Sequence, residues 1–150
     1  MLKKIALAII ALVAAGTAGY YLSNLVHDKA IDPESLPENV QSFINTHFNE
    51  ENIAFSKKDR DFLKMSYEVI LTDGTKLEFR RNGEWKEIDR HHDRLPGGII
   101  HKEVEAKITE LYPDSFATKA EKGSKDMEVD LANGLELKFD KRNTLIGIER

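Results

Sequence analysis

The sequence has 150 residues, enough for one compact domain, and its 41% hydrophobic and 32% charged residues are typical of an ordinary globular protein. Its formal net charge of −4, with interleaved signs, argues against nucleic acid as the main partner. The absence of cysteine excludes disulfides, thiolate metal sites, cysteine nucleophiles and a lipid-modified cysteine. A domain with this sequence is therefore expected to depend on its hydrophobic core alone.

The first residues have the features of a secretory leader. Lys3 and Lys4 precede an uncharged run over residues 5–26, with small residues at 14–19. This pattern predicts a signal peptide over residues 1–19. The alternative is an uncleaved anchor, because the run is long enough to span a bilayer. In both cases the rest of the chain is exported to the periplasm, the cell envelope or the medium. The membrane is then a partner only through an uncleaved leader.

A linker and a helix are predicted next. Residues 20–35 lack periodicity and contain Pro33, so we interpret them as a linker, with an extra strand or helical turn as the alternative. Apolar residues then recur at helical spacing and predict a helix over roughly 37–48. Pro37 suits its first position, where a missing N–H costs nothing. His47 lies on the apolar stripe and is expected to be a partly buried structural residue. The stripe consists of Val40, Phe43, Ile44, His47 and Phe48.

Two strands and a hairpin turn are predicted after this helix. Residues 52–58 form a short first strand, and the charged residues 59–61 form a turn. Apolar and polar residues alternate over 67–72, which is typical of a half-buried strand. Asp73-Gly74 then predicts a two-residue type I′ turn, in which glycine takes the positive φ.

Two more strands complete this unit. Residues 76–80 alternate again, with Leu77 and Phe79 pointing inward. Asn82-Gly83 makes a second tight turn before a last strand over 84–89. Trp85 and Ile88 have opposite parity in that strand, which indicates a bulge or burial on both faces.

The pattern of residues 67–90 returns without a gap at 127–150. Before it, a second apolar stripe predicts a helix that Pro113 ends, and residues 116–122 predict another strand. The chain therefore divides into repeat one, 36–90, and repeat two, 95–150. The identical pairs are Glu68/Glu128, Val69/Val129, Leu71/Leu131, Gly74/Gly134, Leu77/Leu137, Phe79/Phe139, Ile88/Ile148 and Arg90/Arg150. The second stripe consists of Ile100, Val104, Ile108, Leu111 and Tyr112.

The predicted fold class is α+β. Two tandem repeats, each a helix followed by an antiparallel meander of about four strands, form one continuous antiparallel sheet with both helices packed on one face. The other face is expected to be solvated, mixed in charge and concave or saddle-shaped. Trp85 is open to two interpretations, a core residue or an exposed binding anchor. The candidate partner-binding residues on the helix-free face are Ile70, Lys76, Glu78, Arg80, Trp85, Lys86, Lys138 and Asp140.

No catalytic, phosphate-binding or nucleotide-binding motif is present, so we predict that the protein is not an enzyme and needs no cofactor. His91 and His92, followed by Asp93, are weak metal-ligand candidates, because adjacent histidines on an extended chain point apart. An incidental role is the expected one.

The elements resemble an exported bacterial family described as PepSY-like or putative beta-lactamase-inhibitor-like, over residues 36–150. The resemblance implies tandem α/β repeats in one sheet, similar to the beta-lactamase inhibitory protein, which grips its enzyme with the concave face. It also implies an inhibitory or regulatory role in the envelope, but it transfers no functional residue. The motifs that carry it are Leu36-Pro37, Leu95-Pro96, Leu111-Tyr112-Pro113, Asn82-Gly83-Glu84-Trp85, and the hairpins over 67–79 and 127–139.

The leading hypothesis is an exported binding module without enzymatic activity, which binds an envelope protein or peptide through the helix-free face. The alternative is a small-ligand or metal-binding envelope protein that uses His91, His92 and the region between the repeats. The terminal strand near Arg150 is a candidate unpaired edge, which favours dimerisation.

Overall fold

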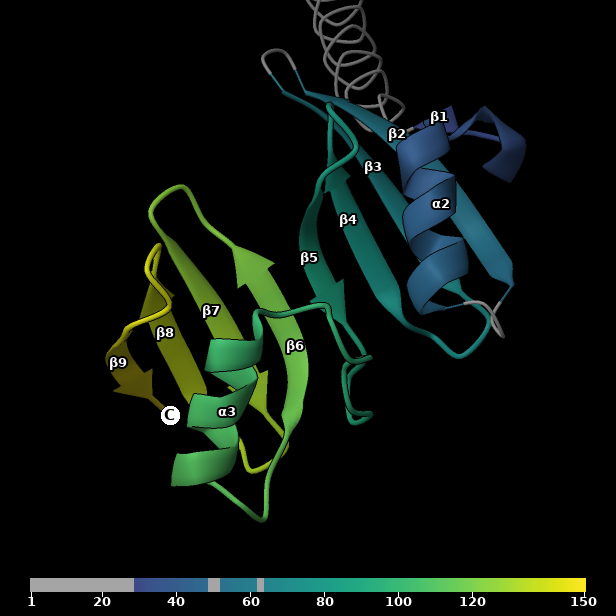
Figure 1. Ribbon diagram of the computed structural model, residues 1–150. Helices are drawn as coiled ribbons and strands as arrows, with labels where there is room; N and C mark the ends of the chain where they lie inside the picture. The colour runs from purple at the N-terminus through teal and green to yellow at the C-terminus, as the bar shows by residue number, and fades with distance from the viewer. Residues whose placement is uncertain (1–28, 49–51, 62–63) are drawn as a thin grey trace, which may run out of the picture.

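The fold is described here from a computed structural model, in which residues 29–48, 52–61 and 64–150 are placed. The predicted leader and the linker residues before Lys29 lie outside this part of the chain. Nine strands form one antiparallel sheet in the order of the sequence, so the fold class is α+β, as predicted (Figure 1). The strands are β1 (Lys29–Ala30), β2 (Ile53–Asp61), β3 (Lys64–Leu71), β4 (Lys76–Arg80), β5 (Trp85–Asp89), β6 (Ala117–Lys122), β7 (Asp126–Leu131), β8 (Glu136–Asp140) and β9 (Leu145–Glu149). The helices are α2 (Glu38–His47) and α3 (Lys102–Leu111), and η1 is a 3-10 turn at Pro33–Ser35.

Helix α2 confirms the helix predicted over roughly 37–48. Pro37 lies one position earlier than expected, because it caps the helix and its carbonyl accepts from the Val40 amide at 2.9 Å. Val40 and Ile44 are buried, and the Phe43 ring meets the Phe79 ring edge-on, with 5.5 Å between centroids. The apolar stripe of α2 therefore packs on the sheet at β4.

Helix α3 is also amphipathic, with Val104 and Ile108 buried. The predicted stripe is only partly correct here, because Ile100 is buried but precedes the helix and Leu111 is exposed. In Figure 1, α2 lies in front of the strands of the first half and α3 in front of those of the second. The described part of the chain contains no helix that is long and apolar enough to cross a bilayer.

One row of cross-strand partners runs through the core of both halves. Its members pair in turn across β3 to β8, and none of them has exposed surface. Because the row continues through the β5–β6 junction, the two halves share a single hydrophobic core. The row consists of Val69, Leu77, Ile88, Ala120, Val129 and Leu137.

The hairpin turns differ from the prediction. Gly74 has a φ of 86°, but Asp73 is not left-handed, so the turn is not type I′. The amides of Gly74 and Leu71 bond to the carbonyls of Leu71 and Thr75, which closes a three-residue loop. This is the type I turn plus a left-handed residue, the next most common hairpin. The same two bonds recur around Gly83, Gly134 and Asn143. The Asp73-Gly74 and Asn82-Gly83 signals identified the places of their turns, and the length predicted for the Asp73-Gly74 turn was wrong.

Strand β2 is longer than predicted. Residues 59–61 were expected to form a turn, but Asp59, Arg60 and Asp61 pair with Ser66, Met65 and Lys64 in the β2–β3 hairpin. The turn prediction is wrong, because charged residues were taken as a sign of a loop. Charged residues can continue a strand, because the pairing is made by the main chain.

Residues 29–35, which were assigned to the linker, already belong to the fold. Lys29 and Ala30 pair with Lys58 and Lys57, and the Ser56 hydroxyl donates to the Ile31 carbonyl at 2.7 Å. The alternative that remained open, an extra strand and a helical turn, describes these residues. A strand of two exposed residues has no periodicity, so the sequence could not reveal it.

The predicted irregularity of the Trp85 strand is confirmed as a β-bulge. The register shifts between Glu78 and Phe79, and this shift lets Trp85 and Ile88 be buried together. A matching shift occurs between Lys138 and Phe139 in the β8–β9 pair.

Candidate binding surface

The face opposite the buried row presents a line of carboxylates. Neighbouring strands place glutamates directly opposite one another from β3 to β7. Like charges in this position destabilise a sheet, so this arrangement is unusual for a surface that serves stability alone. We call this line the glutamate row. Its members, in strand order, are Lys57, Glu68, Glu78, Glu87, Glu121, Glu128, Lys138 and Gly147.

Lysines offset part of this repulsion. Lys57 lies 3.5 Å from Glu68, Lys86 lies 3.1 Å from Glu78, and Lys138 bonds to Glu128. Lys119 lies 4.0 Å from Glu87. Burial alone would lower the pKa of Lys119, but the surrounding carboxylates, Glu87 foremost, raise it. These ion pairs hold the glutamates in a fixed pattern.

A second line of partners runs beside the glutamate row and has a different character at each end. We call it the mixed row. At its first end, Phe55 is 42% exposed and lies opposite Ile70, which makes an apolar patch. Its members are Phe55, Ile70, Lys76, Asp89, Lys119, Asp130, Glu136 and Glu149.

The other end of the mixed row is acidic. Glu136 lies opposite both Asp130 and Glu149. Burial and then the charges of Glu128, Asp130 and Glu149 raise the pKa of the Glu136 carboxyl. Burial likewise raises the pKa of Asp130, against the pull of Lys119. The second half of this face therefore carries negative charge that its own lysines do not balance.

The candidate residues of the sequence analysis do not all share this surface. Ile70, Lys76, Glu78 and Lys138 belong to the two rows, and Lys86 reaches Glu78 from the bulge. The sequence analysis did not select Phe55, Glu87 or Glu121. The parity of their strands could have identified them, once Ile88 and Ala120 were assigned to the core.

Three other candidates have structural contacts. The Arg80 guanidinium donates to the Lys122 carbonyl. Asp140 accepts from the Arg142 and Thr144 amides, and these hydrogen bonds, led by the one from Thr144, lower its pKa. Trp85 is 7% exposed, with the Lys122 ammonium 3.7 Å from its ring centroid. Trp85 therefore belongs to the core, and a cation covers the exposed part of its ring.

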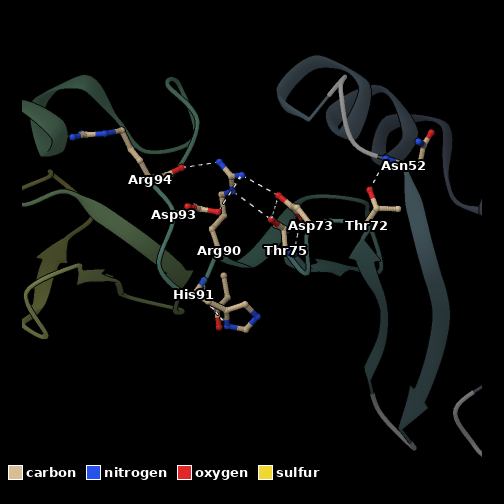
Figure 2. A network of polar contacts seen from close by, with 9 residues as sticks. Asn52, Thr72, Asp73, Thr75, Arg90, His91, Asp93 and Arg94 are labelled. Atoms are coloured by element: carbon tan, nitrogen blue, oxygen red, sulfur yellow. Dashed lines mark hydrogen bonds and ion pairs between the residues drawn. The ribbon is translucent and has the colours of Figure 1, made fainter.

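A polar network joins the turn between β3 and β4 to the connection that follows β5 (Figure 2). Arg90 donates to Asp73 and to the Arg94 carbonyl, both at 2.9 Å, and to the Thr75 hydroxyl at 3.3 Å. Burial alone would raise the pKa of Asp73, but hydrogen bonds from Thr75 and Arg90 and the charge of Arg90 lower it. This network fixes the connection to the turn.

His91 and His92 lie on the surface, and no third potential ligand is grouped with them among the described residues. Both are exposed, and the His91 Nδ1 lies 3.7 Å from Asp89. Within residues 29–48, 52–61 and 64–150, no group of three or more potential ligand side chains is placed to hold a metal ion.

A pocket of about 210 Å³ lies between α3, the connection and the start of β6. The Arg94 guanidinium stacks 4.5 Å above the Phe116 ring at its wall. The Ser115 hydroxyl also lines it, and this buried oxygen has no hydrogen-bond partner among the described residues. His91 and His92 are not part of its lining, which consists of Arg94, Leu95, Gly97, Ile100, Glu105, Ile108, Thr109, Ser115, Phe116 and Ala117.

Comparisons with known proteins identify relatives with the same fold. A putative calcium-regulated periplasmic protein from Bacteroides thetaiotaomicron is 42% identical, with a TM-score of 0.80 over 82% of this chain and 97% of that chain. A putative periplasmic protein of the DUF2874 family from Bacteroides vulgatus is 36% identical, with a TM-score of 0.80 over 83% and 98%. A putative periplasmic protein of unknown function from the same species is 31% identical, with a TM-score of 0.78 over 82% of this chain and 99% of that chain.

The search of curated proteins found no match. The family described as putative beta-lactamase-inhibitor-like, PepSY-like matches residues 65–147, which extend from the third strand to the last. This span includes the hairpins on which the resemblance was based. The chain belongs to this PepSY-like, putative beta-lactamase-inhibitor-like family.

Proposed function

We propose that the protein is an exported binding protein without enzymatic activity, in which two tandem repeats place both helices on one face of the sheet and leave the other face to capture a protein or peptide. Its role is inhibitory or regulatory, as the family description implies. The observation that carries the proposal is the glutamate row, whose glutamates lie directly opposite one another across five strands. Export is supported by the periplasmic descriptions of three relatives and by the predicted leader.

The two ends of the face indicate what a partner looks like. Phe55 and Ile70 offer an apolar anchor at one end. At the other end Glu136, Asp130 and Glu149 lie together, which favours a basic segment of the partner. Burial raises the pKa of Glu136 and the neighbouring carboxylates raise it further, and binding such a segment would offset the charges of these neighbours. The face therefore fits a partner with an apolar side chain and a lysine- or arginine-rich stretch.

The test is a double variant, Glu121→Gln with Glu136→Gln, used as bait in a pull-down from envelope extract. Both side chains face other carboxylates, so removing their charges should leave the melting temperature unchanged or slightly higher. Capture of the partners that the wild type retains should fall severalfold. The matched control is Glu110→Gln with Asp114→Asn, which removes two exposed carboxylates at the end of α3. Equal capture by all three proteins would contradict the assignment of this face.

The pocket beside α3 supports a second candidate function, the capture of a small ligand. Its specific observation is the unpartnered Ser115 hydroxyl next to Arg94 and Phe116. A thermal-shift screen with small metabolites, with calcium as a separate condition, tests this function. Ser115→Ala should abolish any shift that arises in the pocket, whereas a shift that survives in this variant points to another site. Calcium belongs in the screen because one relative is described as calcium-regulated.

A further inference from the structure

The last strand, β9, ends the sheet with one edge uncovered in the described chain. Figure 1 shows it at the outer side of the second half. Ile146 is 56% and Ile148 is 50% exposed there. An exposed edge with apolar side chains is a site at which another strand can pair. The chemistry of a strand that would pair with β9 can be inferred from β5, the equivalent strand of the first half.

Strand β5 shows what an occupied edge of this kind looks like. Residues 85–89 and 145–149 are the matching strands, and both follow a bulged pairing with the strand before them. On β5 the outer edge is occupied by β6, with Ala120 opposite Ile88 and Lys119 opposite Asp89. The Arg90 amide extends this ladder to the Thr118 carbonyl at 3.0 Å.

The chemistry of that pair transfers to β9 position by position. Ile148 in β9 corresponds to Ile88 in β5, and Ile88 lies opposite Ala120 of β6. A small apolar residue therefore fits opposite Ile148. Glu149 corresponds to Asp89, which lies opposite Lys119 of β6. On the other side of Glu149, Glu136 lies opposite it, and Asp130 lies opposite Glu136. A basic side chain opposite Glu149 would meet three carboxylates, as Lys119 does at Glu87, Asp89 and Asp130.

We propose that β9 binds an extended peptide segment by strand addition, with a small apolar residue opposite Ile148 and a lysine or arginine opposite Glu149. The main chain of the segment supplies the ladder, and these two side chains set the register. This site is the edge of the sheet, and it adjoins the acidic end of the face proposed above, with which it shares Glu149, Glu136 and Asp130.

A second copy of this chain fits the edge less well. The strand that corresponds to β6 in the first half is β2, and its outer edge is already paired with β1 through Lys58 and Lys57. Antiparallel pairing of β9 with a second β9 about Gly147 would place Glu149 opposite Leu145 of the other copy. This pairing would give the carboxylates of Glu149 and Glu136 no basic partner.

The probe is a synthetic peptide that copies residues 115–123, acetylated and amidated at its ends, titrated into the purified protein. Binding is followed by fluorescence anisotropy and by amide chemical shifts. Shifts are expected at residues 145–149 and not at 85–89. Replacing the lysine that corresponds to Lys119 by glutamate in the peptide should weaken binding about fivefold, the equivalent of one ion pair of about 1 kcal/mol. An Ala120→Pro peptide, which disturbs the ladder, should not bind.

The decisive variant is Glu149→Lys. It should lose about fivefold in affinity for the lysine peptide and gain a similar factor for the glutamate peptide, because the charge pair is exchanged. Glu149 is exposed, so folding should be unaffected. Absence of the exchange would overturn the register, and shifts at 85–89 would mean that the peptide displaces β6 instead. A concentration-dependent dimer in light scattering, together with no binding of the peptide, would assign the edge to a second copy and also overturn the proposal.

Discussion

The two halves of the sheet carry the same sequence pattern, yet they bury it to different extents. Ile88 in β5 has no exposed surface, whereas Ile148, at the matching place in β9, is 50% exposed. Both residues oppose a buried leucine in the preceding strand. The difference comes from the next strand, because β6 covers β5 and no described strand covers β9. A repeated pattern therefore determines which way a side chain points, and its neighbours determine whether water reaches it.

The halves also differ in how the turn between β3 and β4 and its counterpart between β7 and β8 are fixed. Asp73 and Thr75 hold Arg90 in the first half. The matching residues of the second half are Asn133 and Leu135, and Asn133 accepts only from the Leu135 amide at 3.2 Å in its turn. The first half thus uses a charged network where the chain must continue into a connection, and the second half uses a simple turn.

The largest expected difference between the two halves concerns the stability contributed by the matching isoleucines, Ile88 and Ile148. Ile88→Ala should lower the free energy of unfolding by about 3 kcal/mol, because it leaves a cavity in a fully buried row. Ile148→Ala should cost less than about 1 kcal/mol, since half of its surface is already in water. Urea denaturation of both variants measures the difference. Equal costs would show that the β9 edge is covered in solution.

The hairpin comparison can be tested by giving the first half the turn residue of the second. Asp73→Asn keeps the turn and removes the ion pair with Arg90, so it should cost about 1 kcal/mol at neutral pH. Because the pKa of Asp73 is lowered in the folded protein, its contribution is present above the ordinary carboxyl pKa and is lost as the pH falls through the lowered value. The difference in the free energy of unfolding between the wild type and Asp73→Asn should therefore become smaller at low pH. The reverse change, Asn133→Asp, is the control, and it should not add stability because no Arg90 equivalent is bonded there.

The smallest expected effect concerns the acidic end of the face. Glu136→Gln should raise stability at pH 7, by no more than about 0.5 kcal/mol. The pKa of Glu136 is raised by folding, so its ionisation costs stability as the pH rises through that pKa, and the cost is absent in acid. The gain should therefore disappear at low pH. Thermal unfolding at several pH values checks this sign, which is opposite to that of Asp73→Asn.

Much of the local structure was predictable because each element leaves a periodic signal. The stripe of α2, the alternation in β3, β4, β7 and β8, and the bulge at Trp85 all follow from the spacing of apolar residues. The charged end of β2 and the short β1 were missed, because neither a run of charged residues nor a strand of two residues produces an apolar period. The turn glycines were located correctly. A two-residue type I′ turn also needs a positive φ at Asp73, and the residue type alone does not show whether Asp73 adopts it.

The candidate surface was only partly predictable for a related reason. Parity within one strand identifies Lys76 and Glu78 as outward, but it does not say which residues of the next strand lie beside them. The glutamate row exists only through the register of the strands, above all where Glu87 of β5 meets Glu121 of β6. These two strands are joined by a long connection that includes α3, and no local signal sets their alignment.

The sequence by itself determined the fold class, the family, the helices and most of the strands, since these depend on local periodicity and on recurring motifs. Only the tertiary structure decided that Trp85 is core, that Glu136 lies among carboxylates and that Ile148 is at a bare edge. Burial and electrostatics depend on neighbours that are distant in the chain. The same pattern of residues therefore serves as core beside β6 and as exposed edge at β9.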